Sequence, residues 1–349
     1  MTTREKTKSV KIKNIIMGGN DRVYVQSMLN KPASDAKGNL AQALELQAAG
    51  CELIRLSVPD KESLKTVELL KQNIDVPLVA DIHFDYRLAV ECAKLGIDKI
   101  RINPGNIGSS DGVKQVASIC SQKNIPIRIG VNSGSVKKEY LEKYGVCARS
   151  LFESAMGHVR LLNQYGFDDI VLSLKSSNVQ MMYDAYILAA NNCDYPLHLG
   201  VTEAGTALSG TLKSAVGIGG LLLAGMGNTV RVSLTDEPIK EIAAANQILK
   251  AAGIKKEGIK IVSCPTCGRT KIDLIGIAQA AEKALENTDK NLTVAIMGCA
   301  VNGPGEAREA DIGIAGGDKE GILFKKGEII KKVPETQLLS ALLQEIEKM

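Results

Sequence analysis

Three cysteines in the last third of the chain have the spacing of metal ligands. Cys264 and Cys267 form a C-x-x-C pair after a β-branched run. Cys299 lies further on, in the segment Met-Gly-Cys-Ala-Val-Asn-Gly-Pro-Gly-Glu that ends at Glu306. Both cysteine segments are expected where a strand enters a turn containing Gly or Pro, and such turns expose N–H groups that can donate to sulfur. The spacing therefore predicts a metal or redox centre.

Several chemistries use a C-x-x-C pair, among them redox disulfides and zinc sites. A redox disulfide is expected in a thioredoxin-like context, which does not precede this pair. Zinc usually takes four N or S ligands, but no histidine follows His198 and this region offers only three cysteines. We favour a 4Fe–4S cluster, which tolerates three thiolates with a different fourth ligand. The expected ligands are Cys264, Cys267, Cys299 and Glu306.

The composition favours a reduced, intracellular protein. The N-terminus has no apolar leader, and the longest apolar run, 215–227, is shorter than the ~20 residues of a membrane span. We therefore expect a cytoplasmic protein whose eight cysteines are thiols or metal ligands. The cysteines outside the cluster motif are expected to fill the core. They are Cys51, Cys92, Cys120, Cys147 and Cys193.

The elements before the cysteine motifs predict an α/β barrel. Eight short β-branched runs alternate with segments of helical apolar spacing. The runs are Val23–Met28, Leu53–Val58, Leu78–Ile82, Lys99–Asn103, Pro126–Val131, Ile170–Lys175, Leu197–Thr202 and Thr229–Leu234. Eight strand–helix units over about 250 residues predict a TIM (β/α)8 barrel. An open doubly wound sheet is the alternative, but no Gly-rich dinucleotide loop follows the first run.

Polar residues gather at the ends of these runs, at alternating positions that share one face. They are Arg55 with Ser57, Asp81 with His83, Arg101 with Asn103, Arg128 with Asn132, Ser173 with Lys175, His198 with Thr202, and Arg231 with Ser233. In a barrel these ends meet at one mouth. The cations outnumber the nearby carboxylates Asp81 and Glu203, and burying an unpaired cation is unfavourable. We therefore expect a polyanionic ligand, phosphate or diphosphate, with the histidines either structural or catalytic.

The chain is expected to form two domains, a barrel over 1–252 and a small α+β domain over 256–349, joined near 253–258. The second domain is expected to contain strands at Lys260–Ser263, Leu292–Met297, Ala310–Ala315, Ile322–Phe324 and Ile329–Val333, with helices at Asp273–Leu285 and Gln337–Ile346. The net charge is +4, and residues 1–13 are basic. We expect a solvated terminus, because no basic patch with interleaved aromatics follows to bind nucleic acid.

Together these motifs resemble the 4-hydroxy-3-methylbut-2-enyl diphosphate synthase family in its compact bacterial form. The resemblance rests on the two cysteine motifs and on strand-end motifs along the whole chain. The latter are Val25-Gln-Ser-Met28, Arg55-Leu-Ser-Val58, Ala80-Asp-Ile-His83, Arg101-Ile-Asn-Pro-Gly-Asn106, Ser173-Leu-Lys175 and Leu199-Gly-Val-Thr-Glu-Ala-Gly205. It implies reductive ring opening and dehydration of 2-C-methyl-D-erythritol 2,4-cyclodiphosphate, a step of isoprenoid synthesis by the methylerythritol phosphate route.

The resemblance also implies roles for individual residues. The diphosphate contacts would be Arg55, Arg101, Asn103, Arg128, Asn132, Lys175, Asn178, Thr202 and Ser233, with Asp81 and His83 as further contacts. Glu203 would be the acid that protonates the departing oxygen, which requires a pKa raised by burial. Glu306 would leave its iron during catalysis. Flavodoxin or ferredoxin would deliver two electrons, and a homodimer would place the cluster domain of one subunit over the barrel of the other.

Two other function classes remain open at this point. One is a barrel transferase similar to dihydropteroate synthase, with a structural metal in its C-terminal tail. The other is an iron–sulfur sensor that binds phosphorylated metabolites without turning them over. Metal content, colour and turnover would separate these classes.

Overall fold

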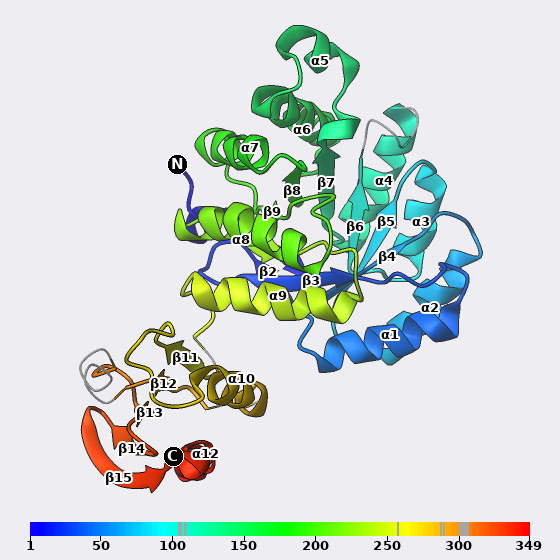
Figure 1. Cartoon of the computed structure of the whole chain (residues 1–349). Coiled ribbons are helices and arrows are strands. Elements are labelled where there is room, and N and C mark those ends of the chain that lie inside the picture. The colour runs from blue at the N-terminus through cyan, green and yellow to red at the C-terminus, as the bar shows by residue number, and fades with distance from the viewer. Residues whose placement is uncertain (104–106, 108–109, 257, 287, 289, 300–306) are drawn as a thin grey trace. The chain divides into compact units, whose positions relative to one another are not determined.

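The chain forms two compact units, Met1–Ile254 and Lys255–Met349. The computed structural model describes residues 1–103, 107, 110–256, 258–286, 288, 290–299 and 307–349 (Figure 1). Each unit has its own sheet and its own hydrophobic core. None of the helices within these ranges is long and apolar enough to cross a bilayer.

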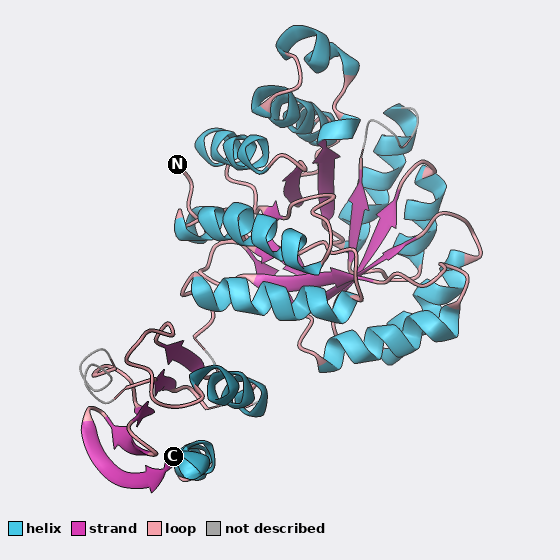
Figure 2. Ribbon diagram, in the orientation of Figure 1, coloured by secondary structure: helices cyan, strands magenta, loops and turns pink. Residues whose placement is uncertain are grey.

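The first unit is a parallel barrel with its helices on the outside (Figure 2). Its strands are β3 (Tyr24–Met28), β4 (Leu53–Ser57), β5 (Leu78–Ile82), β6 (Lys99–Ile102), β7 (Ile127–Asn132), β8 (Ile170–Lys175), β9 (His198–Leu199) and β10 (Thr229–Val230). Their order is β8-β7-β6-β5-β4-β3-β10-β9, and a parallel bridge between Leu172 and Leu197 joins the two outer strands. The TIM barrel is therefore confirmed, and the open sheet is excluded.

The last two barrel strands are shorter than the sequence suggested. Regular pairing stops after Leu199, where Gly200 follows, and glycine weakens a strand because it offers no side chain to pack. The Arg231 N–H still donates to the Leu199 carbonyl at 3.0 Å. The chain therefore continues toward the mouth without forming a full ladder.

Helices cover the outside of the barrel and bury its outward residues. They are α1 (Ala36–Ala48), α2 (Ser63–Asn73), α3 (Tyr86–Lys94), α4 (Ser110–Lys123), α5 (Lys138–Tyr144), α6 (Ala148–Asn163), α7 (Val179–Asn192), α8 (Ala207–Leu223) and α9 (Pro238–Ala251). Outward strand residues such as Leu56, Ile82 and Ile102 belong to the main hydrophobic cluster with apolar helix residues. Because strand residues alternate, the neighbouring positions face the barrel interior.

A short N-terminal hairpin covers the amino ends of the barrel strands. It consists of β1 (Val10–Ile12) and β2 (Ile15–Met17), which pair antiparallel. The apolar cluster that joins hairpin and barrel contains Val10, Ile12, Met17, Tyr24, Leu53, Val79 and Val171. The last four are inward residues at the starts of β3, β4, β5 and β8, so the hairpin closes that end with apolar side chains.

The prediction of a solvated basic terminus is wrong for Arg4, whereas Lys6, Lys11 and Lys13 are exposed as expected. The Arg4 guanidinium is buried and donates to the carbonyls of Leu222 at 2.5 Å and Met226 at 3.2 Å. Lys8 forms an ion pair with Asp168 at 2.7 Å. These basic side chains satisfy carbonyl and carboxylate groups of the barrel, so their charge alone was a poor guide to exposure.

Within its described residues, the second unit is a mixed sheet with two α-helices. The strands are β11 (Lys260–Ser263), β12 (Thr293–Met297), β13 (Ile312–Gly316), β14 (Glu320–Lys325) and β15 (Glu328–Pro334), in sequential order across the sheet. The helices are α10 (Leu274–Leu285) and α12 (Leu338–Glu347). The first three strands are parallel and the last two antiparallel. The carboxyl ends of β11 and β12 therefore lie at one end of this sheet.

Candidate functional site

The barrel interior is polar toward the carboxyl ends of the strands. Ladder pairing places Asp81 beside Arg101, and Arg101 beside Arg128. Lys175 pairs with Asn132 on the neighbouring strand. Most inward positions at the amino end are apolar, with Lys99 and His198 as exceptions, whereas the inward side chains toward the mouth are charged or amide groups. These predicted site residues lie on neighbouring strands at the end where TIM-barrel proteins bind ligands.

Asp81 is the centre of a hydrogen-bonded cluster at this mouth. Its fully buried carboxylate accepts from Arg55 at 2.5 Å and from Arg101 at 3.0 Å, and His83 Nε2 lies 3.2 Å away. Burial alone would raise the pKa of Asp81, but Arg55, the hydrogen bond from His83, and Arg101 together hold it well below its usual value. Asp81 is therefore an anion that fixes these side chains.

Two inward glycines leave the space that cationic side chains occupy. A Cβ on Gly130 would lie 2.5 Å from Arg101 Nε, and a Cβ on Gly200 would lie 2.6 Å from Lys175 Nζ. Such distances are far below van der Waals contact. Arg101 uses the space to donate to the Gly130 carbonyl at 3.1 Å. The glycines are thus a steric requirement of the site that its charged residues did not reveal.

Arg231 is held by a carboxylate that sequence analysis missed. Glu241 on α9 accepts from Arg231 at 2.9 and 3.2 Å, and also from Ser27 at 3.0 Å. Arg231 in turn donates to Ser233 at 2.8 Å. Glu241 is buried although it lies on an outer helix. The unmatched charge of Arg231 was the available signal for such a partner.

Arg128 and Lys175 are buried basic side chains with few acceptors. Arg128 is 1% exposed, and its NH1 lies 3.5 Å from the Gln26 side-chain oxygen. Burial lowers the pKa of both groups, and neighbouring arginines lower it further. An arginine keeps its proton in proteins, so an anion nearby would relieve this repulsion. The mouth is therefore electrostatically prepared for a negatively charged ligand.

The neutral predicted contacts occupy less uniform positions. Asn103 is buried, and Asn132, Thr202 and Ser233 are half-buried near the strand ends. Asn178 is exposed and caps α7, accepting from the Met181 N–H at 2.9 Å. Its side-chain oxygen is thus committed to the helix, whereas its amide group is a donor available to a ligand.

Glu203 lies in the loop after β9 with a left-handed backbone, φ 52°. Residues other than glycine rarely adopt this conformation, and it occurs at functional sites where neighbouring structure imposes it. The side chain is exposed. The burial expected for Glu203 is therefore absent within the described part of the barrel.

The predicted cluster ligands lie in the second unit. Cys264 directly follows β11, and its sulfur accepts a 3.2 Å hydrogen bond from the N–H of Gly298, the residue before Cys299. This contact brings two cysteine segments together at one end of the sheet. Cys267 is exposed, and hydrogen bonding from the Arg269 N–H lowers its pKa, favouring the thiolate form that binds metals.

The described residues alone do not form a complete metal site. Within the described ranges, no three His, Cys, Asp or Glu side chains converge as a metal site. Glu306, the predicted fourth ligand, lies outside the described residues. The donor chemistry nevertheless fits an iron–sulfur cluster, since backbone N–H groups already point at sulfur.

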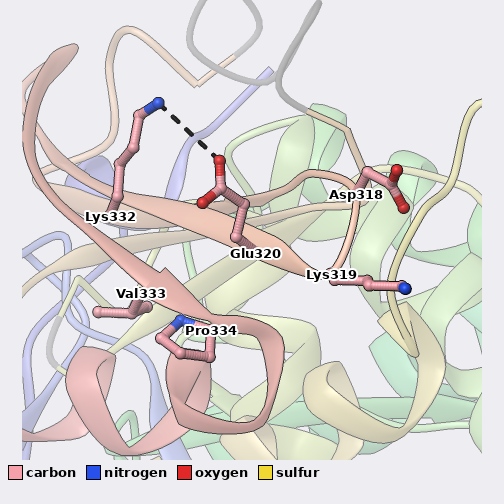
Figure 3. A pocket seen from close by; sticks show the side chains of 6 residues that line it. All are labelled: Asp318, Lys319, Glu320, Lys332, Val333 and Pro334. Atoms are coloured by element: carbon pink, nitrogen blue, oxygen red, sulfur yellow. Dashed lines mark ion pairs between the residues drawn. The ribbon is translucent and has the colours of Figure 1, made fainter.

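A surface pocket lies at the same end of the second sheet. Asp318, Lys319, Glu320, Lys332, Val333 and Pro334 line it. Figure 3 shows the Lys332 amine directed toward Glu320, and their ion pair spans 3.9 Å. Because β14 runs antiparallel to β13, this pocket and the carboxyl ends of β11 and β12 share one end of the sheet. The pocket contains none of the predicted site residues.

The fold and the site define a TIM-barrel protein with a cationic mouth and a separate cysteine-bearing α+β unit. The family model described as GcpE TIM-barrel domain matches residues 7–246, and the GcpE protein C-terminal domain matches residues 260–348. The chain therefore belongs to the GcpE family, whose curated members among its relatives are named 4-hydroxy-3-methylbut-2-en-1-yl diphosphate synthase (flavodoxin).

The similarity to these relatives extends over nearly the full chain. The protein from Clostridium acetobutylicum is 55% identical over 347 residues, which is 99% of each chain. The protein from Geobacter sulfurreducens is 51% identical over 346 residues, covering 99% of this chain and 98% of the relative. Both carry the name given above, so the resemblance inferred from the motifs is confirmed.

Solved structures with a similar barrel belong to other families. Dihydropteroate synthase from Yersinia pestis with a sulfonamide drug has a TM-score of 0.53 at 15% identity, covering 71% of this chain and 100% of that one. A second structure of that enzyme has a TM-score of 0.51 at 16% identity, covering 71% and 99%. At this identity the likeness shows the barrel fold alone, and it does not support the transferase alternative.

Proposed function

We propose that this chain catalyses the reductive ring opening and dehydration of 2-C-methyl-D-erythritol 2,4-cyclodiphosphate to 4-hydroxy-3-methylbut-2-enyl diphosphate in isoprenoid biosynthesis. Its full-length relatives carry the name of that oxidoreductase. The structural observation that carries the proposal is the mouth of the barrel, where buried arginine and lysine side chains exceed the carboxylates that hold them. A cyclic diphosphate supplies the anionic oxygens that such a mouth requires.

In this proposal the barrel binds and orients the diphosphate. Arg55, Arg101, Arg128 and Lys175 donate charge-assisted hydrogen bonds to its oxygens, and Asp81 keeps the first two in position. Arginine suits this role because its planar donors match phosphate oxygens in pairs. The other contacts proposed around them are Asn103, Asn132, Asn178, Thr202, Ser233 and His83. Binding thus replaces repulsion among cations with attraction to the ligand.

Glu203 is proposed to donate the proton that the departing oxygen needs. A carboxylic acid does this at neutral pH only when its pKa is raised, and removal from water is the usual cause. Because Glu203 is exposed in the barrel, its activation requires cover from the substrate or another protein segment. Glu203 lies in the loop that follows β9, where its backbone adopts the left-handed conformation.

Cys264, Cys267 and Cys299, with Glu306 as the fourth ligand, are proposed to hold a 4Fe–4S cluster. When bound, the cluster would supply the two electrons that the reaction consumes. The contribution of this chain is the thiolates and the N–H donors around them, such as that of Gly298. Donors of this kind stabilise charge on sulfur and tune the reduction potential.

We propose a flavodoxin as the electron donor, because the relatives' names specify one, with ferredoxin as the alternative. A cytoplasmic location is the matching proposal for an enzyme that uses such donors.

A homodimer is proposed as the working unit, in which the cluster domain of one subunit serves the barrel of the other. Helix α8 supports association because it exposes an apolar stripe. Leu208, Leu212 and Val216, four residues apart, are 76%, 58% and 68% exposed. Residues at this spacing share one helix face, and contiguous exposed apolar surface is typical of interaction sites.

The test is an anaerobic assay of the full chain after iron and sulfide reconstitution, with the cyclic diphosphate and reduced flavodoxin. We expect formation of the linear allylic diphosphate, and loss of turnover with retained ligand binding in the Glu306→Ala variant. A colourless protein with stoichiometric zinc and no turnover would overturn the proposal. Ligand binding without turnover in the reconstituted wild type would instead indicate a sensor.

A further inference from the structure

Beneath the cations of the mouth lies a second, deeper group of polar side chains. Lys99 opens β6 and lies two residues before Arg101, so it faces the same interior one layer closer to the closed end. Lys99 is 0% exposed, and its Nζ has no hydrogen-bond partner within the described part of the chain. His198 at the start of β9 is equally buried, and neither of its ring nitrogens has a partner there.

The charged groups that act on Lys99 are cations of other barrel strands. Val79 lies beside it on β5. Arg128 on β7 and Arg55 on β4 lower the pKa of Lys99, after burial, which is the largest cause. The other charged or titratable side chains of this interior are Asp81 on β5, Arg101 on β6, Lys175 on β8, His198 on β9, and Arg231 on β10 with its partner Glu241 from α9.

The two buried carboxylates of this interior are already engaged. Asp81 accepts from Arg55 and Arg101, and Glu241 accepts from Arg231 and Ser27. A buried ammonium group without an acceptor is strongly unfavourable. Burial beside these cations therefore disfavours the ammonium form of Lys99, and a negative charge placed at the mouth would favour it.

We propose that Lys99 is the proton-accepting residue of the anion site: its Nζ takes up one proton from solvent when a diphosphate binds and returns it when the ligand leaves. This inference rests on the proposed function, because it needs the anion to occupy the mouth. The transfer is balanced, since the amine lone pair binds the proton and no other bond changes. Lys99 acts through charge, one layer below the groups that touch the ligand.

The linkage has a definite sign. In the empty site Lys99 is neutral above its lowered pKa, and in the occupied site it is charged. Binding therefore takes up a proton between these two pKa values, and affinity falls as pH rises through that window. For one proton, the dissociation constant rises about tenfold per pH unit. Below the lower pKa both states are charged, so the dependence disappears.

The test is calorimetry of inorganic pyrophosphate binding to the full chain, in two buffers of equal pH and different ionisation enthalpy. The buffer difference gives the number of protons taken up. We expect the wild type to exceed Lys99→Met by about one proton, because protonation of pyrophosphate itself is common to both proteins. Lys65→Met removes an exposed lysine on α2 and should match the wild type.

Each outcome decides the matter. Equal proton uptake by wild type and Lys99→Met would overturn the inference while leaving the anion site intact, and any uptake beyond that of pyrophosphate itself would then belong to another group, such as Lys175 or His198. Absence of pyrophosphate binding to wild type would overturn the anion site and this inference with it. Should Lys99→Met not fold, sulfate, which does not titrate near neutral pH, serves as the probe of the wild type. A sulfate affinity independent of pH would then overturn the inference.

Discussion

Asp81 and Arg55 form a 2.5 Å ion pair at the mouth of the barrel in which the Asp81 side chain is wholly buried and the Arg55 side chain remains 13% exposed. The Asp81 carboxylate is thus covered by its partner, whereas part of the Arg55 side chain stays exposed. Arg101 uses the other carboxylate oxygen at 3.0 Å. One fully buried carboxylate therefore organises two of the arginines proposed to bind the diphosphate.

Replacing Asp81 by Asn is expected to lower both stability and ligand affinity. Loss of one partner leaves buried guanidinium groups uncompensated, which costs about 3 to 5 kcal/mol. Urea denaturation at neutral pH would measure the loss. Asp184→Asn, which changes an exposed carboxylate on α7, is the control and should retain the wild-type midpoint. Wild-type stability in Asp81→Asn would contradict the central position given to this carboxylate.

The lowered pKa of Asp81 predicts that the stability of the fold depends on pH. The folded-state pKa of Asp81 lies well below the ~3.9 of an unfolded aspartate. Its contribution to stability is therefore complete above about pH 5 and is lost as pH falls through the unfolded and then the folded value. Denaturation curves at decreasing pH should fall more steeply for the wild type than for Asp81→Asn. Parallel curves for the two proteins would show that Asp81 has the same pKa in the folded and the unfolded state.

Gly130→Ala tests the steric requirement of the cationic mouth. The added methyl would lie 2.5 Å from Arg101 Nε, so the guanidinium must move away from Asp81. Overpacking of this kind costs about 1 to 3 kcal/mol, and we expect weaker pyrophosphate binding as well. Gly134→Ala is a matched control, because nothing lies within 4 Å of the added methyl there. Equal binding by the two variants would contradict the steric argument.

Serine substitutions at the cysteines separate the proposed ligands from the other thiols. Cys264→Ser, Cys267→Ser and Cys299→Ser should each lose iron and visible absorbance after anaerobic reconstitution. Cys193→Ser is the control, because this thiol donates to the Ala189 carbonyl on α7 at 3.2 Å, a bond that a hydroxyl can also make. Retained iron in any of the first three variants would remove that cysteine from the ligand set.

The stripe on α8 predicts how the chain associates. Leu212→Glu places a charge in the middle of the exposed apolar face, and we expect sedimentation analysis to report a monomer. Lys213→Glu also adds negative charge, one residue further along the exposed part of the helix, and should leave the dimer intact. A dimer that tolerates Leu212→Glu would place the interface elsewhere.

Much of this fold was predictable because the barrel strands carry two independent patterns. Outward positions such as Ile82 and Ile102 are apolar, while inward positions such as Asp81 and Arg101 are polar. The same alternation would also have revealed Lys99, which shares the face of Arg101, had it been followed back to the start of the strand. The proposed site residues were thus found where the pattern was followed to the strand ends.

The remaining features depend on contacts between distant parts of the chain. Glu241 belongs to a helix and looks solvated until its ion pair with Arg231 is seen. Arg4 looks like part of a charged tail until the carbonyls of α8 and its following turn are placed beside it. Neither partner follows from local periodicity, because both contacts join segments far apart in sequence.

The N-terminal hairpin makes the two ends of the barrel interior different, because it covers one of them. Val10, Ile12 and Met17 seal the amino end with apolar side chains, through which a hydrated ion or a proton carried by water would pass only at a high free-energy penalty. Exchange between the interior and bulk solvent is thereby directed to the opposite end. Substrate entry, product departure and any proton bound by Lys99 must share that one route, so an occupied mouth would also set the rate at which the interior equilibrates with solvent.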